Sequence, residues 1–484
     1  MAATVVSGER SAPSGERDDI QGLLASGYGH LPHAAYLLFT IDDTHAAAGW
    51  LAQLADTVTT ARARQARRSL NAALSAAALV KLGLSETARS GFPLEFTSGM
   101  VDDAHRRRIL GDVGVNAPEL WAWGGPDTPP VELLLLCFGE TSHELARLIE
   151  EQRQAARGVT LVLELPASSD TFDHFGFRDG ISQPSVAGLR SGPPAQTISA
   201  GEFLLGYRNE YGQFTGRPLL DPREDPHEIL PEDAAGSGRR DLGRNGSYLV
   251  SRQLSQDVPG FWRWVDSALA PSSGPGVNGH GDPQARRVAL ASRLVGRWPG
   301  GAPLTLSPDR DDPGLATAAD FGYFAQDADG TRCPIGAHVR RSHPRDSLDP
   351  SPGTDRSIAL DKHHRLLRRG RKYGSMLSAE EALAASPGES DQRGLHFICL
   401  CASIERQYEF VQRTWVNSTK FDGLYDNADP LVSGGTRTFT VQAEPVRKRY
   451  LELPPFVRTR GGGYFFLPGV RALRYLASVA KDSK

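Results

Sequence analysis

The chain has 484 residues and a net charge of −3; 39% of its residues are apolar and 23% are charged. This length exceeds that of most single-core domains, and the composition is that of an ordinary globular protein with room for a cofactor in its core. The near-neutral charge lacks the basic field of a general nucleic-acid binder, so we expect no nucleic-acid partner.

The termini and the cysteines bear on the compartment. Residues 1–18 are polar and carry no apolar secretory core, and no window approaches the ~20 apolar residues that span a bilayer. We therefore expect a disordered leader over 1–18, no membrane partner and a cytoplasmic location. The cysteines are sparse and form no CxxC pair, which argues against a disulfide framework and a zinc ribbon; they are Cys137, Cys333, Cys399 and Cys401.

The first half of the chain alternates predicted strands and helices. Thr141 and Glu144 have capping-box spacing, which marks the start of one helix. In chain order we expect a strand over 34–41, a helix from 46 to about 68, a strand over 132–138, a helix over 142–156 and a strand over 160–165.

The second half follows a loop over 187–198 that is rich in Gly, Pro and Ser. A strand is expected over 202–207 and another over 395–402. The helix after the latter should bury one face, because Ile404, Tyr408, Val411 and Trp415 recur at helical spacing. The last expected strands are 438–441 and 464–467.

A strand that leads directly into an amphipathic helix occurs in both halves. This pattern indicates a duplicated α+β unit, a sheet with helices on one face. Two unrelated α+β domains would produce the same pattern, and sequence alone does not fix the strand order.

Three segments carry candidate functional residues. The first is HFGFRDGISQP, over 174–184, in which Asp179 lies between Arg178 and Gly180. Glycines beside an aspartate allow the backbone to approach a bulky group closely and point a short carboxylate into a cavity. A simple Asp-Gly turn with a solvated carboxylate is the alternative.

The second segment is RCPIGAHVRRSHPRD, over 332–346. His338 lies in its apolar part, and a neutral imidazole is a common iron ligand. Its arginines could pair with carboxylates of a cofactor. The alternative interpretation is an ordinary core or surface histidine beside arginines that form a solvated basic face.

The third segment is HHRLLRRGRKYG, over 363–374. Arg368 follows two leucines, and a guanidinium above an apolar cavity can bind and polarise peroxide. The alternative is a basic surface loop, which is the interpretation we favour for Arg369, Arg371 and Lys372.

Taken together, these segments resemble the dye-decolourising peroxidases, a family of haem peroxidases. HFGFRDGISQP carries the family's GxxDG motif, RCPIGAHVRRSHPRD is similar to its proximal-histidine segment, RRGRKYG to its distal-arginine segment, and RGGGYFFLPGVRAL to its C-terminal pattern. The resemblance implies an α+β fold of two ferredoxin-like halves with antiparallel sheets, helices outside, and haem between the sheet and helices of the C-terminal half. The expected domains are 19–190, which ends with GxxDG, and 191–484, which binds haem.

The resemblance also implies a role for individual residues. His338 corresponds to the proximal iron ligand, Asp179 to a distal proton shuttle and Arg368 to a distal charge stabiliser. Leu395 and Phe397 correspond to apolar residues of the distal cavity. Arg340 and Arg345 are the expected partners of the haem propionates, and Asp429 is expected to orient the proximal histidine. The sequence departs from the family pattern at His343, where Asn is expected, and this leaves the propionate contacts open. It also has Lys372 where Pro is common, which would loosen that loop.

The implied activity is reduction of hydrogen peroxide with one-electron oxidation of dyes, phenolics or other aromatic donors. No CxxCH occurs, so the cofactor would be non-covalent haem b. An aspartate base predicts an acidic pH optimum. Rival interpretations are a haem-binding or iron-handling protein without turnover, a chlorite-dismutase-like enzyme, and a protein without haem; the distal acid argues against the first two.

Overall fold

The computed structural model describes residues 14–63, 66–269, 282–385, 392–434 and 437–482. Its main sheet is antiparallel at every pairing. The strands of this sheet are β1 (His33–Ile41), β2 (Arg68–Leu74), β3 (Leu133–Gly139), β4 (Val159–Ser168), β9 (Ser247–Gln256), β10 (Leu367–Arg368), β11 (Arg371–Tyr373), β12 (Gly394–Cys401) and β15 (Val457–Leu467).

The first half forms a four-stranded unit in the order β4-β1-β3-β2. β1 leads into α1 (Thr44–Thr57), and β3 leads into α6 (Ser142–Ala155). The hydroxyl of Thr141 accepts a hydrogen bond from the backbone N–H of Glu144 at 3.2 Å, so the predicted helix start is confirmed. Numbered along the chain, this strand order is 4-1-3-2, the order of a ferredoxin-like unit.

The second half repeats the same plan. β9 lies between β15 and β12, and β12 pairs with β10 and β11 on its other side. β9 is followed by α7 (Val258–Ala268) and α8 (Pro283–Val295), and β12 by two π-helical segments, η10 (Ile404–Glu409) and η11 (Val411–Val416). The prediction of two ferredoxin-like halves is therefore confirmed.

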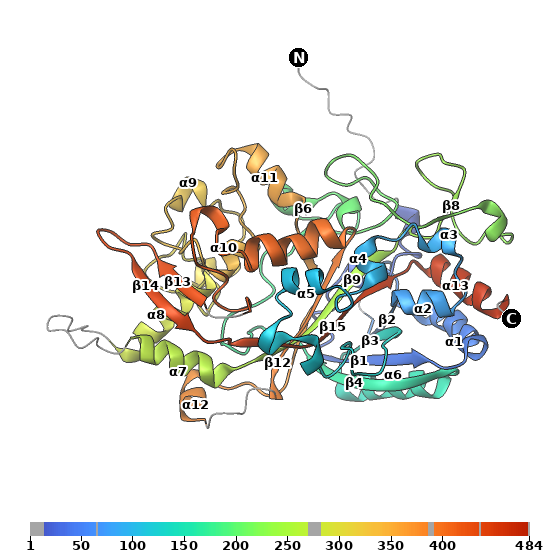
Figure 1. The fold of residues 1–484 in the computed structure, drawn as a ribbon, viewed down its shortest axis with the longest axis horizontal. Coiled ribbons are helices and arrows are strands. Elements are labelled where there is room, and N and C mark those ends of the chain that lie inside the picture. The colour runs from blue at the N-terminus through green and yellow to red at the C-terminus, as the bar shows by residue number, and fades with distance from the viewer. Residues whose placement is uncertain (1–13, 64–65, 270–281, 386–391, 435–436, 483–484) are drawn as a thin grey trace, which may run out of the picture.

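The two halves join into one closed ring of strands, because β12 also pairs with β9. Figure 1 shows α6 along β4 and β1, and α13 beside α1. β15 meets β2 through the single pair Phe466 and Leu74, and β11 meets β4 through Lys372 and Ser168. Because the pairing crosses between halves, the division into 19–190 and 191–484 stays a prediction.

Both faces of β1, β2 and β3 are buried, which explains the long apolar runs of β1 and β3. Leu37 and Phe39 of β1 belong to an outer core that includes α1, whereas Tyr36 and Leu38 belong to a core on the opposite face. Successive side chains of a strand point to opposite faces, so a sheet covered on both sides needs apolar residues at every position.

Shorter elements surround this ring and extend the second half. Among the described residues, no helix combines the length and the apolar character that crossing a bilayer requires. The remaining helices and strands are α2 (Ala76–Lys81), α3 (Glu86–Arg89), α4 (Leu94–Ser98), α5 (Ala104–Leu110), α9 (Phe324–Asp327), α10 (His338–Ser342), α11 (Asp355–Lys362), α12 (Ala379–Ala384), α13 (Val470–Asp482), β5 (Ser185–Val186), β6 (Thr197–Ile198), β7 (Leu219–Leu220), β8 (Arg240–Asp241), β13 (Arg437–Val441) and β14 (Lys448–Leu453).

Three sequence-based expectations are corrected. The first helix ends at Thr57, because the β-branched run Val58–Thr60 favours extended backbone, and Arg68, where the helix was expected to end, is the first residue of β2. The expected strand over 202–207 is a buried turn region in which Gly206 has a φ of +83°. Residues 1–13 lie outside the described residues, but Glu16 is not part of a disordered leader, since it pairs with Arg471 at 2.9 Å.

Candidate active site

A cavity of about 290 Å³ lies between the second-half strands and the helices that cover them. This volume is close to the lower end of the range for ligand-binding cavities, roughly 300–1,000 Å³. Its wall is built from β9, β12, β15, α10, the two π-helical segments and the loop after β4. The lining residues used below are Asp173, Arg178, Asp179, Ser182, Arg252, Arg297, His338, His343, Arg365, Arg368, Leu395, Phe397 and Tyr408.

The GxxDG loop and β10 bring the carboxylate of Asp179 and the guanidinium of Arg368 together on this wall. Arg368 Nη1 donates to Asp179 Oδ1 at 3.3 Å, and its Nη2 donates to the carbonyl of Ile181 at 3.1 Å. Gly176 and Gly180 have φ values of +94° and +78°, which residues with a β-carbon rarely adopt. The loop therefore needs both glycines to turn the aspartate toward Arg368.

His338 is the first residue of α10, and its Nδ1 lies 2.8 Å from Oδ2 of Asp429. Asp429 is fully buried, and its other carboxylate oxygen accepts hydrogen bonds from the N–H groups of Leu431 and Val432. Burial alone would lower the pKa of His338, but the charge and hydrogen bond of Asp429 outweigh it and raise that pKa. No hydrogen bond to His338 Nε2 occurs within the described residues, so this nitrogen is available to a ligand.

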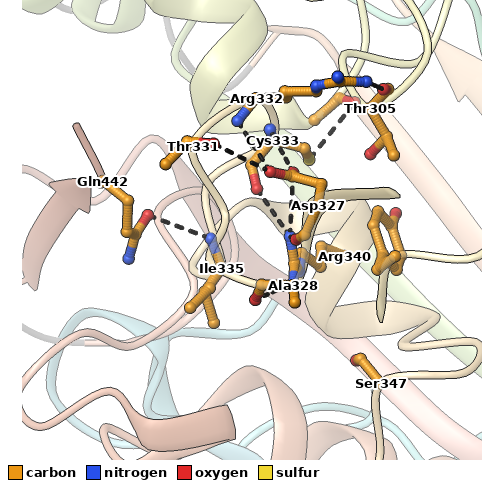
Figure 2. A network of polar contacts seen from close by, with 12 residues as sticks. Thr305, Asp327, Ala328, Thr331, Arg332, Cys333, Ile335, Arg340, Ser347 and Gln442 are labelled. Carbon is orange, nitrogen blue, oxygen red and sulfur yellow. Dashed lines mark hydrogen bonds and ion pairs between the residues drawn. The ribbon is translucent and has the colours of Figure 1, made fainter. Parts of the chain in front are cut away.

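A buried polar network holds the loop that precedes His338 (Figure 2). The Asp327 carboxylate accepts from the N–H groups of Arg332 and Cys333 at 2.9 and 2.8 Å. Arg340 pairs with the same carboxylate at 3.2 Å and donates to the carbonyl oxygens of Asp327 and Cys333. The network therefore ties α10 to the chain that leads into it.

Neither arginine predicted to bind propionates lines the cavity. Arg340 is fully buried in the network around Asp327, which is why the structure does not bring it to the site. Arg345 donates to the carbonyls of Ala319 and Phe321, and it reaches the cavity wall only through the hydroxyl of Ser182 at 3.2 Å. Nearby carbonyl and carboxylate groups of the protein already pair with these two guanidiniums, which keeps them away from the cavity.

Two of the arginines that line the cavity, Arg297 and Arg365, lie beside Ser182, and the sequence reasoning missed both. Arg297 Nη2 lies 3.3 Å from the Ser182 hydroxyl, and Arg365 Nη2 donates to the Ser182 carbonyl at 2.9 Å. Burial lowers the pKa of each guanidinium to about 10, so both stay charged at neutral pH. The basic HHRLLRRGR run signalled Arg365, whereas Arg297 follows a plain amphipathic helix.

A second carboxyl group, Asp173, also lines the cavity. Its Oδ1 accepts from the N–H of Phe177 at 2.9 Å. Burial and the negative charge of Asp179 raise its pKa to about 7. The sequence reasoning missed Asp173, although it lies only six residues before Asp179.

His343 lines the cavity as well, with its Nε2 3.1 Å from Asp361 Oδ2. Burial and the charge of Arg365 lower the pKa of His343 to about 3, so its ring is neutral. Leu395 and Phe397 of β12 also line the cavity.

The donor set of the cavity fits haem. One imidazole nitrogen is free to ligate a metal, while the other is fixed by a carboxylate. The arginines exceed the two lining carboxyls, which suits a ligand with two carboxylate groups. Apolar side chains from the strands and the π-helical segments would contact the faces of a flat ring.

Comparisons with known proteins identify the family of the chain. No family model matches the chain. A dye-decolorizing peroxidase of Exidia glandulosa is 30% identical over 491 residues, which cover 94% of this chain and 86% of that protein. A fungal DyP-type peroxidase of Auricularia auricula-judae has a TM-score of 0.76 at 26% identity, covering 95% and 99% of the two chains. A dye-decolorizing peroxidase in complex with 2,6-dimethoxyphenol has a TM-score of 0.75 at 25% identity, covering 96% and 99%. The chain belongs to the dye-decolorizing peroxidase family, whose members are oxidoreductases that act on peroxide.

Proposed function

We propose that this peroxidase binds haem b without covalent links and that His338 would be the ligand of its iron. One observation carries the proposal: His338, tied to buried Asp429, lines the same cavity as the Asp179–Arg368 pair. Asp429 would fix the tautomer in which Nε2 is the ligand and increase its basicity. Bound there, haem would accept two oxidising equivalents from hydrogen peroxide and pass them on one at a time.

Asp179 and Arg368 would handle the peroxide. The Asp179 carboxylate would take the proton from one peroxide oxygen and return it to the other, which leaves as water. Arg368 would donate hydrogen bonds to the oxygen on which negative charge develops. The contact of 3.3 Å between Arg368 Nη1 and Asp179 Oδ1 holds the two groups side by side, so both could reach the same peroxide molecule.

The arginine side of the cavity would hold the haem carboxylates. Arg297 and Arg365 both line the wall, and Ser182 lies between them. Arg345 would contribute indirectly, through Ser182. Leu395 and Phe397 would keep the space near Arg368 apolar, which strengthens the hydrogen bonds made there.

Phenolic and dye-like compounds are the donors we propose. Support comes from the similar peroxidase in complex with 2,6-dimethoxyphenol. An aspartate base works at a pH at which a histidine base would be protonated, so we expect an acidic optimum. The cytoplasmic location expected from the sequence stays a prediction.

The test starts from purified protein loaded with haem. We expect a Soret band, and peroxide-dependent oxidation of 2,6-dimethoxyphenol that is faster at pH 4 than at pH 7. Asp179→Asn and Arg368→Leu should each slow the reaction with peroxide in rapid mixing. Asp170→Asn is the matched control, because Asp170 lies in the same segment but pairs with Lys372 outside the cavity wall.

Two results would contradict the proposal. Haem binding without peroxide turnover would favour the haem-binding or iron-handling alternative. A rate maximum above about pH 7 would argue against Asp179 as the base.

A further inference from the structure

A buried tyrosine next to the cavity wall is bonded to a buried acid. The hydroxyl of Tyr464, on β15, donates to Oε1 of Glu409 at 2.8 Å. Both side chains are about 5% exposed or less. Arg106 forms an ion pair with the same carboxylate oxygen, with an Nε–Oε1 distance of 3.0 Å. The phenol therefore has a proton acceptor that is itself held by a cation.

Aromatic rings connect this tyrosine to the cavity. Phe397 and Tyr408 both line the cavity, and their ring centroids are 6.2 Å apart. The ring of Tyr408 lies 6.2 Å from that of Tyr464, with an interplanar angle of 76°. The series thus starts on the wall and ends at the phenol that is bonded to Glu409.

The backbone of the covering helix makes this arrangement possible. Tyr408 and Glu409 are adjacent residues at the end of η10, a π-helical segment that continues into η11. π-Helical turns are rare and occur frequently at functional sites. Here the turn places Tyr408 on the cavity wall and its neighbour Glu409 against Tyr464.

The electrostatic surroundings couple the loss of an electron to the loss of a proton. Burial raises the pKa of Tyr464 well above 10, so its phenol is protonated in the resting protein. A phenol that lost only an electron would become a cation, and a buried site disfavours an unpaired charge. Burial also raises the pKa of Glu409, which makes this carboxylate a better proton acceptor.

We propose that Tyr464 is an internal one-electron donor of this peroxidase. When no external donor is present, its phenol gives one electron toward the cavity by way of Tyr408 and its proton to Glu409. The O–H bond of Tyr464 breaks and an O–H bond forms on Glu409. The products are a neutral tyrosyl radical and a neutral glutamic acid beside Arg106. The electron removes one of the two oxidising equivalents that peroxide delivers, so this inference rests on the proposed function.

Not every buried tyrosine hydroxyl in this fold forms a hydrogen bond. Tyr36 and Tyr248 are as buried as Tyr464, and their hydroxyls have no hydrogen-bond partner within the described residues. Tyr36 also lies outside the lining of the cavity. Tyr36→Phe is therefore a matched control for Tyr464→Phe.

The experiment uses haem-loaded protein mixed with one equivalent of hydrogen peroxide, without a donor, and frozen for electron paramagnetic resonance. Ring-deuterated tyrosine identifies which part of the radical signal is tyrosyl. Tyr464→Phe should lose that tyrosyl signal, whereas Tyr36→Phe should retain it. Glu409→Gln keeps the phenol and the side-chain volume but removes the base, so it should lose the signal as well.

The readouts separate the possible failures. Glu409→Gln tests the proposal even if Tyr464→Phe does not bind haem. A full tyrosyl signal in Glu409→Gln, or in a haem-loaded Tyr464→Phe, would overturn the inference while leaving the proposed function intact. Wild-type protein that does not consume peroxide would overturn both.

Discussion

Replacing Asp173 by asparagine tests the charge balance of the cavity. The Asp173 carboxyl lines the wall, and burial together with the charge of Asp179 raises its pKa from 3.8 to about 7. The folded protein therefore binds this proton more tightly than the unfolded chain does. Asparagine resembles the protonated carboxyl in size and lacks a titratable group.

The sign and the size of the effect follow from this shift. The stabilising contribution of the proton is complete below the unfolded pKa of 3.8 and is lost as the pH rises through about 7. One pKa unit corresponds to 1.36 kcal/mol, so the shift sets an upper limit of about 4 kcal/mol. Relative to Asp173→Asn, the wild type should lose up to this amount of unfolding free energy between pH 4 and pH 8.

Denaturant titrations of haem-free protein at several pH values measure this difference without the pH dependence of cofactor binding. Asp170→Asn is a control of opposite sign, because a hydrogen bond from Lys372 lowers the pKa of Asp170. Its contribution should disappear as the pH falls. If the stabilities of wild type and Asp173→Asn ran parallel from pH 4 to pH 8, the assignment of a raised pKa would be wrong.

Three further outcomes are expected. Asp327→Ala leaves the buried charge of Arg340 without its partner, so denaturation should show a loss of about 3–5 kcal/mol of unfolding free energy; a loss below about 1 kcal/mol would refute the role of the network. Asp429→Asn keeps the shape but weakens the hold on His338, so haem titration should show an affinity lower by roughly 10–100-fold; unchanged affinity would count against this contact. His338→Ala should abolish axial ligation, and an unaltered absorption spectrum would exclude it as the ligand.

Much of the fold followed from the periodicity of apolar residues. β1, β3, β4 and β12 were predicted within two or three residues of their ends, because long apolar runs between turn signals have few other solutions. The run over 202–207 is also rich in apolar residues, yet in the structure it forms turns and no strand. Local pattern does not reveal whether a hydrogen-bonding neighbour exists.

The helix after β12 illustrates a different limit. The spacing of Ile404, Tyr408, Val411 and Trp415 correctly predicted one buried face. It did not predict π-helical turns, because the hydrogen-bond pattern depends on what the helix packs against.

The sequence by itself determined which segments build the site: the GxxDG loop, the His338 segment and the Arg368 strand all reach one cavity. The tertiary structure decided which charged groups face it. Arg297 and Arg340 are both buried arginines with basic or apolar neighbours, and no local pattern distinguishes them. Arg340 pairs with Asp327, whereas Arg297 lines the cavity wall. The direction of a long side chain depends on partners that folding brings from elsewhere in the chain.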